Sequence, residues 1–204
     1  MRMCIAKIDP SAFVHPTSLI GYGKVPEDPM ITIMARARVE AFCIIEPGAL
    51  IDEDVVIYHH CVVGRRAKIG KGTKFVDRVR VAADAIVGRD CIIGGNVSER
   101  VLIGDRVTFM GEMAHSHTDA TIQWGVTQEV SPVIEEGCVI AQGAIIIGGI
   151  RVYRNSYISA GQIVKTDVPP NTFVVNGRME PLSRWRGLIR ARGGWIDGVY
   201  CEGQ

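Results

Sequence analysis

Aliphatic side chains recur at every sixth position through most of the chain. The longest run begins at Ile33 and reaches Ile93 without interruption. Its leading positions are Ile33, Val39, Ile45, Ile51, Ile57, Val63, Ile69, Phe75, Val81, Val87 and Ile93. Four residues after each of them stands a small or β-branched residue: Ala37, Cys43, Ala49, Val55, Cys61, Ala67, Thr73, Val79, Ala85, Cys91 and Val97. Because about half of the residues in a soluble protein are apolar, so regular a run has odds below roughly one in a thousand by chance.

Two shorter runs repeat the same period on either side. One consists of Ile134, Ile140, Ile146, Val152, Ile158 and Val164, with Cys138 and Ala144 at the small position. The other consists of Ile8, Val14 and Ile20, with Ala12 and Ser18 at the small position. Neither the period of a helix nor that of a long strand fits these runs. A period of six fits a short strand followed by a tight turn. Three such units close a triangular coil, in which the leading residues point inward and the small residues fit under the corners.

Three interruptions of the period predict departures from the regular coil. The first lies at residues 21–31, which include the segment GYGKVPEDP. The second lies at residues 98–102, where Glu99 occupies a slot that should be apolar. The third, at residues 116–132, is the long segment SHTDATIQWGVTQEVSP. Long loops on a rigid scaffold are where function concentrates, so the third interruption is the first place to look for chemistry.

The repeats and their interruptions predict two parts of the chain. Residues 1–175 are expected to form a β-helix domain that carries the loop insertions near 21–31 and 116–132. Residues 176–204 are expected to form a helical tail. Within the tail, the segment LSRWRGLIRA predicts a short amphipathic helix that covers the last coil, since an open final coil exposes strand edges.

The repeats resemble those of the hexapeptide-repeat family of left-handed parallel β-helix proteins, over about residues 8–170. This resemblance, rather than the period itself, implies the left-handed coil and assembly into a homotrimer. The expected fold is therefore all-β, a left-handed parallel β-helix of hexapeptide repeats with a short C-terminal helix.

Two histidines stand where the chain enters the third loop. The segment FMGEMAHSHTD contains His115 and His117. Transfer of an acyl group from a thioester to an amine or hydroxyl needs a base, and the unperturbed pKa of imidazole lies near neutral pH. Sugar and antibiotic acetyltransferases of this family carry such a histidine on a loop that leaves the coil. Strict continuation of the period points His115 into the interior, so His117 is favoured as the base and His115 is the alternative; Glu112 and Asp119 are the carboxylates that would orient either ring.

The last coils resemble the segment with which the family binds its donor. The runs GAIIIGGI and SAGQIVKTDVP are similar to the family pattern G-A-x-x-x-x-G-V…A-G-S-V-V-x-x-D-V-P. In the family these coils line an acyl-CoA groove between neighbouring subunits. The resemblance implies acetyl-CoA as the donor, with Gly143, Ala160 and Gly161 beside its pantetheine arm and Lys165 near a phosphate. Gln162 departs from the pattern, in which a serine follows the A-G pair.

Composition and charge narrow the class of protein. The chain has 204 residues, enough for one sizeable core, and 23 Lys and Arg residues stand against 22 Asp and Glu residues. This balance gives no reason to expect a nucleic acid or an anionic membrane as partner. No apolar segment is long enough to span a bilayer, so a cytoplasmic protein is expected. The six cysteines form no CxxC pair, which argues against a disulfide framework or a cysteine-rich metal site, and no metal is expected.

The resemblance and the loop histidines favour an acyl-CoA-dependent O- or N-acyltransferase that acts on a sugar, a nucleotide sugar or a small amine or alcohol. One alternative is a metal-dependent enzyme similar to γ-carbonic anhydrase, which binds zinc through histidines in this fold. His60 and His115 are about three coils or roughly 14 Å apart, too far for one metal within a subunit. Another alternative is a non-catalytic β-helix scaffold, which would not need the long histidine-bearing loop.

Overall fold

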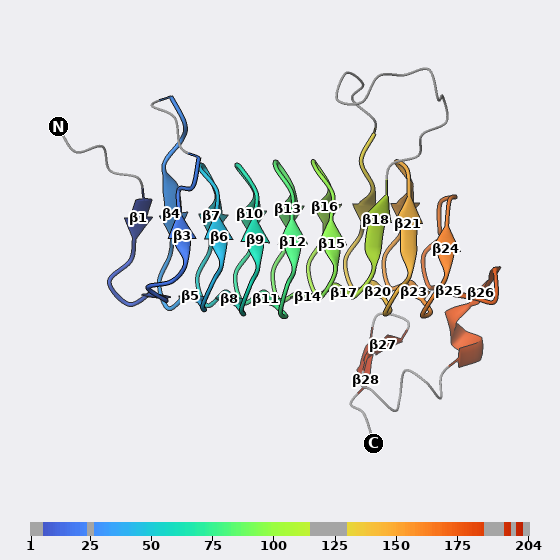
Figure 1. Cartoon of the computed structure of the whole chain (residues 1–204). Coiled ribbons are helices and arrows are strands. Elements are labelled where there is room, and N and C mark those ends of the chain that lie inside the picture. The colour runs from blue at the N-terminus through green and yellow to red at the C-terminus, as the bar shows by residue number, and fades with distance from the viewer. Residues whose placement is uncertain (1–5, 24–26, 115–129, 186–193, 197–198, 202–204) are drawn as a thin grey trace, which may run out of the picture.

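The computed structural model describes residues 6–23, 27–114, 130–185, 194–196 and 199–201. Its strands stack into three parallel sheets that form the sides of a left-handed β-helix, so the predicted fold class is confirmed. Figure 1 shows the coils lying side by side along one axis from β1 to β26. Within the described residues no helix is long and apolar enough to cross a membrane.

Each coil contributes one short strand to each sheet. Sheet A contains, in order, β1 (Ala6–Ile8), β4 (Ile31–Ile33), β7 (Leu50–Ile51), β10 (Lys68–Ile69), β13 (Ile86–Val87), β16 (Leu102–Ile103), β19 (Val133–Ile134) and β22 (Arg151–Val152). Sheet B contains β2 (Phe13–Val14), β5 (Arg38–Val39), β8 (Val56–Ile57), β11 (Lys74–Phe75), β14 (Ile92–Ile93), β17 (Thr108–Phe109), β20 (Val139–Ile140), β23 (Tyr157–Ile158), β25 (Thr172–Val175) and β26 (Arg178–Pro181). Sheet C contains β3 (Leu19–Ile20), β6 (Ile44–Ile45), β9 (Val62–Val63), β12 (Arg80–Val81), β15 (Asn96–Val97), β18 (Glu112–Ala114), β21 (Ile145–Ile147) and β24 (Ile163–Val164). The chain turns at three edges, called here A–B, B–C and C–A after the sheets they join.

The interior is filled as the period predicts. Ile51, Ile69 and Val87 are aligned from coil to coil, and each is at most 2% exposed. Every leading residue from Ile33 to Ile93 is buried to the same degree, as is every small residue four positions later. Stacked aliphatic side chains remove a continuous column of apolar surface from water, which is what stabilises a solenoid whose coils touch only their neighbours. At the N-terminal end Ile8 is 42% exposed, because none of the described residues forms a coil beyond it.

The second interruption of the period lies earlier than the sequence indicated. The strands β14 and β15 are joined by Gly94 and Gly95 alone, whereas all but one of the other B–C corners have four residues. Val97 is therefore the inward residue of β15, not a small corner residue, and Glu99 belongs to the next corner, where it is exposed. The break predicted at residues 98–102 is wrong in position: two corner residues are missing before β15.

The next coil has the same short corner. Met110 and Gly111 alone join β17 to β18, and the inward position of β18 is held by Met113, which packs against the core. Met113 is aligned with the buried Ile146 of the following coil. The count that led from Phe109 to His115 assumed a full corner after Phe109, and that assumption is wrong. His115 itself lies outside the described residues.

The C-terminal region departs from the expected helical tail. β25 and β26 form an antiparallel hairpin that extends sheet B. The 3-10 helix η1 (Leu182–Trp185) follows, and the rest of the predicted helix lies outside the described residues. Two further strands, β27 (Gly194–Ile196) and β28 (Val199–Cys201), pair with each other. The segment that starts the tail is thus a strand, not a helix.

Aromatic packing attaches η1 to the last coil. The ring of Phe173 in β25 lies 5.1 Å from that of Tyr157 and 4.5 Å from that of Trp185, measured between centroids. Leu182 is buried beside them, and the Trp185 indole donates a hydrogen bond to Glu180. The C-terminal end of sheet B is therefore covered by the hairpin and by η1.

Four cysteines lie in the core as small apolar residues. Cys43, Cys61, Cys91 and Cys138 are all buried as free thiols. Burial raises the pKa of Cys91 to about 11 and that of Cys138 to about 12. Their thiols donate to the carbonyls of Gly104 and Tyr153, each at 3.1 Å. Protonated thiols with carbonyl partners are poor nucleophiles, which fits a structural role.

We expect Cys91 and Cys138 to remain unmodified by iodoacetamide in the folded protein at mildly alkaline pH and to be alkylated once guanidinium chloride unfolds it. Above the ordinary thiol pKa of about 8.5 the unfolded chain loses protons that the folded chain still holds. The free energy of unfolding should therefore fall as pH rises from there toward 11 to 12, the folded values. Mass spectrometry of peptides and urea unfolding across this pH range measure both effects. Rapid alkylation of both thiols in the folded state would contradict the assignment.

Candidate functional site

One residue at most corners of the coil adopts the left-handed backbone conformation. Thirteen described non-glycine residues do so, among them Arg36, Phe42, His60 and Asn155. This conformation costs a residue with a Cβ about 1–2 kcal/mol. Because thirteen such residues adopt it here, the fold tolerates that cost. The left-handed conformation alone therefore does not explain why some of these corners have glycine.

Gly143 and Gly161 are two such corners on the B–C edge. Their φ angles are +69° and +71°, and a Cβ built on either would meet no atom within 4 Å. Gly64, by contrast, lies so close to the next coil that a Cβ would approach the backbone of Ala82 to 2.6 Å. Packing between coils thus does not require glycine at positions 143 and 161. The absence of a side chain there leaves the surface of the B–C edge open.

Backbone hydrogen bonds align these corners. The N–H of Gly161 donates to the carbonyl of Gln142 at 3.1 Å, which places the two corners on successive coils. Ala160 stands beside Gly161 and is exposed. The edge continues at Gly177 in the turn of the β25–β26 hairpin, which also has a positive φ and open space at its Cβ position. Gly143, Ala160, Gly161 and Gly177 together are called the glycine strip.

Gln162, which stands where the family pattern has serine, connects the strip to the hairpin. Its side-chain carbonyl accepts a hydrogen bond of 2.8 Å from the N–H of Gly177. A serine hydroxyl is two bonds shorter and would not reach so far. The departure from the pattern therefore has a structural role: it fixes the hairpin turn beside the last corner.

Lys165 is not brought to the strip. It follows β24 on the C–A edge, so the width of sheet C, about 13 Å for four extended residues, separates it from Gly161. Of the four residues predicted to contact the donor, the structure groups Gly143, Ala160 and Gly161 and leaves Lys165 on the opposite edge of the same face.

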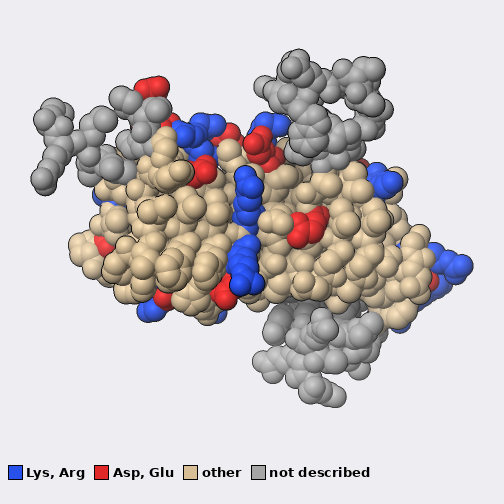
Figure 2. Space-filling view, in the orientation of Figure 1, with Lys and Arg blue, Asp and Glu red and all other residues tan. Residues whose placement is uncertain are grey.

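The outer face of sheet C lies between the glycine strip and the point where the third loop departs. Its outward residues are mostly apolar, including Ile44, Val62, Ile145 and Ile163. Three neighbouring strands interrupt this apolar surface with the polar residues Arg80, Asn96 and Glu112. Figure 2 shows this face as mainly uncharged, crossed by a band of basic side chains with an acidic group near it.

The loop itself leaves from this face. β18 ends at Ala114 and β19 begins at Val133. The predicted bases His115 and His117, and the carboxylate Asp119, lie in the part of the chain that the structure does not describe. Glu112 is described: its carboxylate accepts a hydrogen bond of 2.6 Å from the side-chain amide of Asn96.

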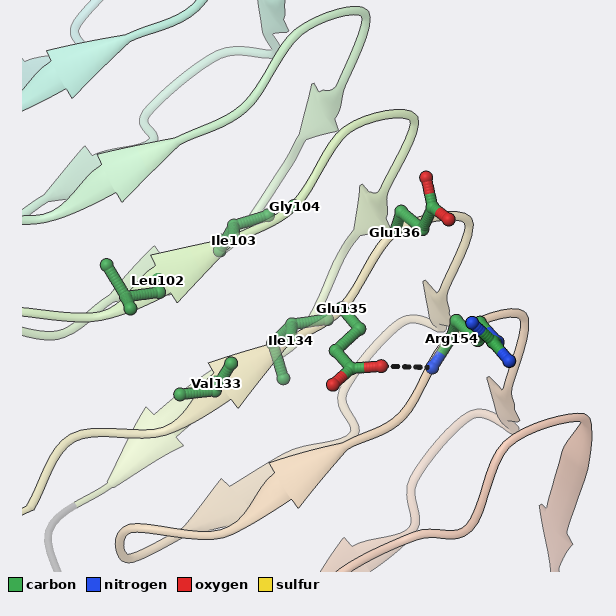
Figure 3. Close-up of a pocket in the computed structure, with 8 residues that line it drawn as sticks. All are labelled: Leu102, Ile103, Gly104, Val133, Ile134, Glu135, Glu136 and Arg154. Atoms are coloured by element: carbon green, nitrogen blue, oxygen red, sulfur yellow. Dashed lines mark hydrogen bonds between the residues drawn. The ribbon is translucent and has the colours of Figure 1, made fainter.

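A separate hollow of about 330 Å³ lies on the outer face of sheet A. Figure 3 shows its apolar side chains Leu102 and Val133 at one end and its charged side chains at the other. Glu135 accepts hydrogen bonds from the guanidinium of Arg151 at 2.8 Å and from the backbone N–H of Arg154 at 3.1 Å. None of the residues predicted from sequence lines this hollow.

The histidine pair on the B–C edge is exposed. The ring of His60 stacks on that of Phe42, with centroids 5.3 Å apart and an interplanar angle of 17°, and His59 lies beside it at 6.4 Å. Among the residues that the structure describes, no three histidine, cysteine, aspartate or glutamate side chains are grouped so that they could hold a metal ion.

The chain shares sequence with several known proteins, although no family model matches it. Bifunctional protein GlmU of Nitrosospira multiformis (strain ATCC 25196 / NCIMB 11849 / C 71) is 27% identical over 161 residues, which cover 78% of this chain and 35% of that protein. Probable serine acetyltransferase 1 of Oryza sativa subsp. japonica is 30% identical over 123 residues, covering 59% and 34%. The chain thus spans only about a third of the length of these two curated relatives.

A solved structure extends the comparison to the whole fold. UDP-N-acetylglucosamine O-acyltransferase (LpxA) from Moraxella catarrhalis RH4 superposes with a TM-score of 0.54 at 15% identity, covering 95% of this chain and 77% of that one. At this identity the likeness concerns the fold alone. Sequence relatives and fold together confirm that this chain resembles the hexapeptide-repeat acyltransferase family, as its repeats first indicated.

Proposed function

We propose that this protein is an acyl-CoA-dependent acyltransferase, with acetyl-CoA as donor and a sugar, a nucleotide sugar or a small amine or alcohol as acceptor. Two similar proteins are named for acyl transfer: the rice protein for acetyl transfer to serine, and the Moraxella protein for O-acylation of UDP-N-acetylglucosamine. Their substrates differ, so the acceptor has to be argued from this chain.

The observation that carries the donor assignment is the open glycine strip. An extended pantetheine arm needs a surface on which side chains do not obstruct it and on which backbone amide groups remain within reach. Gly143 and Gly161 supply such a surface at corners where this fold elsewhere accepts Phe, His and Arg. Close approach to backbone is a recognised reason for glycine at a ligand site.

The chemistry requires one proton transfer and one bond exchange. The acceptor hydroxyl or amine attacks the thioester carbonyl, and His117, or His115 in its place, removes the proton from the attacking atom. Backbone N–H groups stabilise the negative charge that develops on the carbonyl oxygen. The C–S bond then breaks, and the CoA thiolate takes up the proton and leaves as free thiol. No metal is needed at any step.

A homotrimer is part of the proposal. The strip lies on the B–C edge, and the loop leaves near the C–A edge of the coil that precedes Gly143, with sheet C between the two edges. Packing one chain against the next would bring the loop of one subunit toward the strip of its neighbour. Such an arrangement encloses the donor between two surfaces instead of leaving it on one convex edge.

The test is release of free thiol from acetyl-CoA, followed with a thiol reagent, against a panel of amino sugars, nucleotide sugars, serine and chloramphenicol-like alcohols. Acceptor-dependent release, together with binding of acetyl-CoA by calorimetry and a trimeric mass by light scattering, is the expected result. No release with any acceptor and no binding of acetyl-CoA would overturn the proposal and leave the metal-dependent and scaffold alternatives.

Filling the strip should weaken donor binding. We expect Gly161→Phe to raise the dissociation constant of acetyl-CoA at least tenfold, about 1.4 kcal/mol, because the ring would occupy the surface that the pantetheine arm needs. Phe42 holds the equivalent left-handed corner on this edge, so the backbone accepts the residue. Asn155→Phe, at the left-handed A–B corner of the same coil, is the matched control for general strain. Equal affinity in wild type and Gly161→Phe would remove the strip from the donor site.

A further inference from the structure

Arg80, Asn96 and Glu112 form a row across three successive coils. Backbone pairing aligns Arg80 with Asn96 and Asn96 with Glu112. All three are exposed on the outer face of sheet C, while the next residue of each strand, Val81, Val97 or Met113, faces the core. Two strand spacings, about 10 Å, separate the ends of the row.

Apolar residues border the row on both sides. Val62 is aligned with Arg80 on the preceding coil, and Ile145 is aligned with Glu112 on the following one. A polar row set into an apolar face supplies directional contacts within a surface that also favours ring carbons. Sugar-binding surfaces combine these two properties, because a sugar ring has polar edges and apolar faces.

The two ends of the row differ in charge and in partners. The amide of Asn96 is committed to Glu112 at 2.6 Å, which orients that carboxylate and leaves its second oxygen to accept from a ligand hydroxyl or amine. Within the described part of the chain, no carboxylate lies within 4.0 Å of the Arg80 guanidinium. Several arginines at the A–B and C–A corners are paired, as Arg36 is with Asp54 and Arg66 with Asp84.

A guanidinium with no carboxylate partner among the described residues, about 10 Å from an oriented carboxylate, selects a particular ligand. Guanidinium groups bind phosphate and carboxylate through two parallel hydrogen bonds. Glu112 repels an anion and accepts hydrogen bonds, so it favours the hydroxyl- or amine-bearing end of the same molecule. The Glu112 end also belongs to β18, the strand that continues toward the histidine-bearing loop.

We propose that Arg80, Asn96 and Glu112 form the acceptor subsite, and that the acceptor is a monosaccharide with an anionic substituent, bound with its anion at Arg80 and a hydroxyl or amine at Glu112. The role of the sugar as acceptor rests on the proposed function. The binding of the sugar to these three residues does not depend on it. The subsite excludes amines that carry no anionic group as the preferred acceptor, because they offer Arg80 nothing to bind.

The test measures binding without the donor. Glucosamine 6-phosphate, glucuronate and glucose are titrated into the intact protein by calorimetry or NMR. For wild type we expect both anionic sugars to bind more tightly than glucose. Comparison of glucosamine 6-phosphate with glucuronate shows whether the site prefers phosphate or carboxylate. Arg80→Ala should raise the dissociation constant for the anionic sugar at least tenfold, and Arg80→Lys should restore part of it. Glu112→Gln should weaken all three sugars together.

Two residues of the same coil provide matched controls. Lys68 and Lys74 occupy the outward strand position of sheets A and B that Arg80 occupies in sheet C, and both are exposed. Lys68→Ala and Lys74→Ala remove the same charge from the same coil and should leave binding unchanged. An equal loss in all three variants would reduce the effect to net charge, and a loss of the oligomer in Arg80→Ala alone would assign Arg80 to a subunit contact; either result overturns the subsite.

Failure of the subsite and failure of the proposed function are separable. Arg80-dependent sugar binding without any thiol release would keep the subsite and remove the acyltransferase. Thiol release with an acceptor whose KM does not change in Arg80→Ala would keep the acyltransferase and overturn the subsite. If both hold, Arg80→Ala should raise the acceptor KM at least tenfold while the KM for acetyl-CoA stays constant.

Discussion

Replacing Gly95 with alanine is expected to lower the free energy of unfolding by about 3 kcal/mol or more, the upper end of the range for overpacked sites. A Cβ at Gly95 would overlap the carbonyl oxygen of Gly111 on the next coil. That oxygen accepts a hydrogen bond from the N–H of Asn96 at 3.2 Å, so it cannot move away without breaking the ladder between the coils. The atoms that the Cβ would meet are all backbone atoms of Gly111, so no side-chain rotation relieves the clash.

Urea unfolding followed by circular dichroism measures the loss. Gly143→Ala is the matched control, since a Cβ there meets open space and only the left-handed conformation, about 1–2 kcal/mol, opposes it. If the two variants lose the same stability, the short corner has room to adjust and the steric account of Gly95 is wrong.

Removal of the base should have the largest effect on activity. We expect His117→Ala to lower kcat by about 10²–10⁴-fold, the usual contribution of a positioned general base, while the binding of acetyl-CoA and the mass of the oligomer stay unchanged. His115→Ala is expected to have a smaller effect. Both residues lie outside the described part of the chain, so kinetics must decide between them.

Added imidazole separates a chemical role from a structural one. A variant that lacks only the base should recover part of its rate as free imidazole enters the vacated space, whereas a misfolded loop should not. A larger loss in His115→Ala, with rescue by imidazole, would exchange the two roles. Full activity in both single variants and in the double variant would remove histidine from the mechanism.

The repeat predicted the fold because each coil obeys the same rule. From Ile33 to Ile93 an inward aliphatic residue and a small corner residue can be assigned by counting, and the structure buries both sets. Counting failed after Ile93 because valine suits both positions. Val97 fits as a small corner residue if the period continues from Ile93, and as an inward residue if the corner is two residues shorter, as it is in the structure. The paired glycines at 94 and 95 were the local signal of a shortened corner.

The hairpin after the last coil also had a signal. Residues 172–181 contain an Asn-Gly pair between two strands, the strongest short-range pattern for a two-residue hairpin turn. Asn176 and Gly177 both have positive φ, as that turn requires. The expected tail placed a helical region across this segment, and the hydrophobic pattern of the following residues concealed the turn.

The candidate site was predictable only in part. Gly143, Ala160 and Gly161 were found together through the family pattern, and the structure adds that a Cβ at either glycine would meet open space. Arg80 and Asn96 were missed, because an outward polar residue in one coil looks like any other until the coils are aligned. Alignment of Asn96 with Glu112 depends on both short corners, so it could not be counted from the period.

The two short corners also bear on how such a chain can change over generations. Gly95 lies against Gly111, so one shortened corner is covered by another, and the full corners at residues 76–79 and 141–144 stand on either side. A deletion confined to one coil would leave the corner of its neighbour without backbone to pack on. Insertions and deletions at the corners of this solenoid are therefore expected to be tolerated when adjacent coils acquire them together. Among homologues, corner length should then vary in groups of adjacent coils and not in single coils.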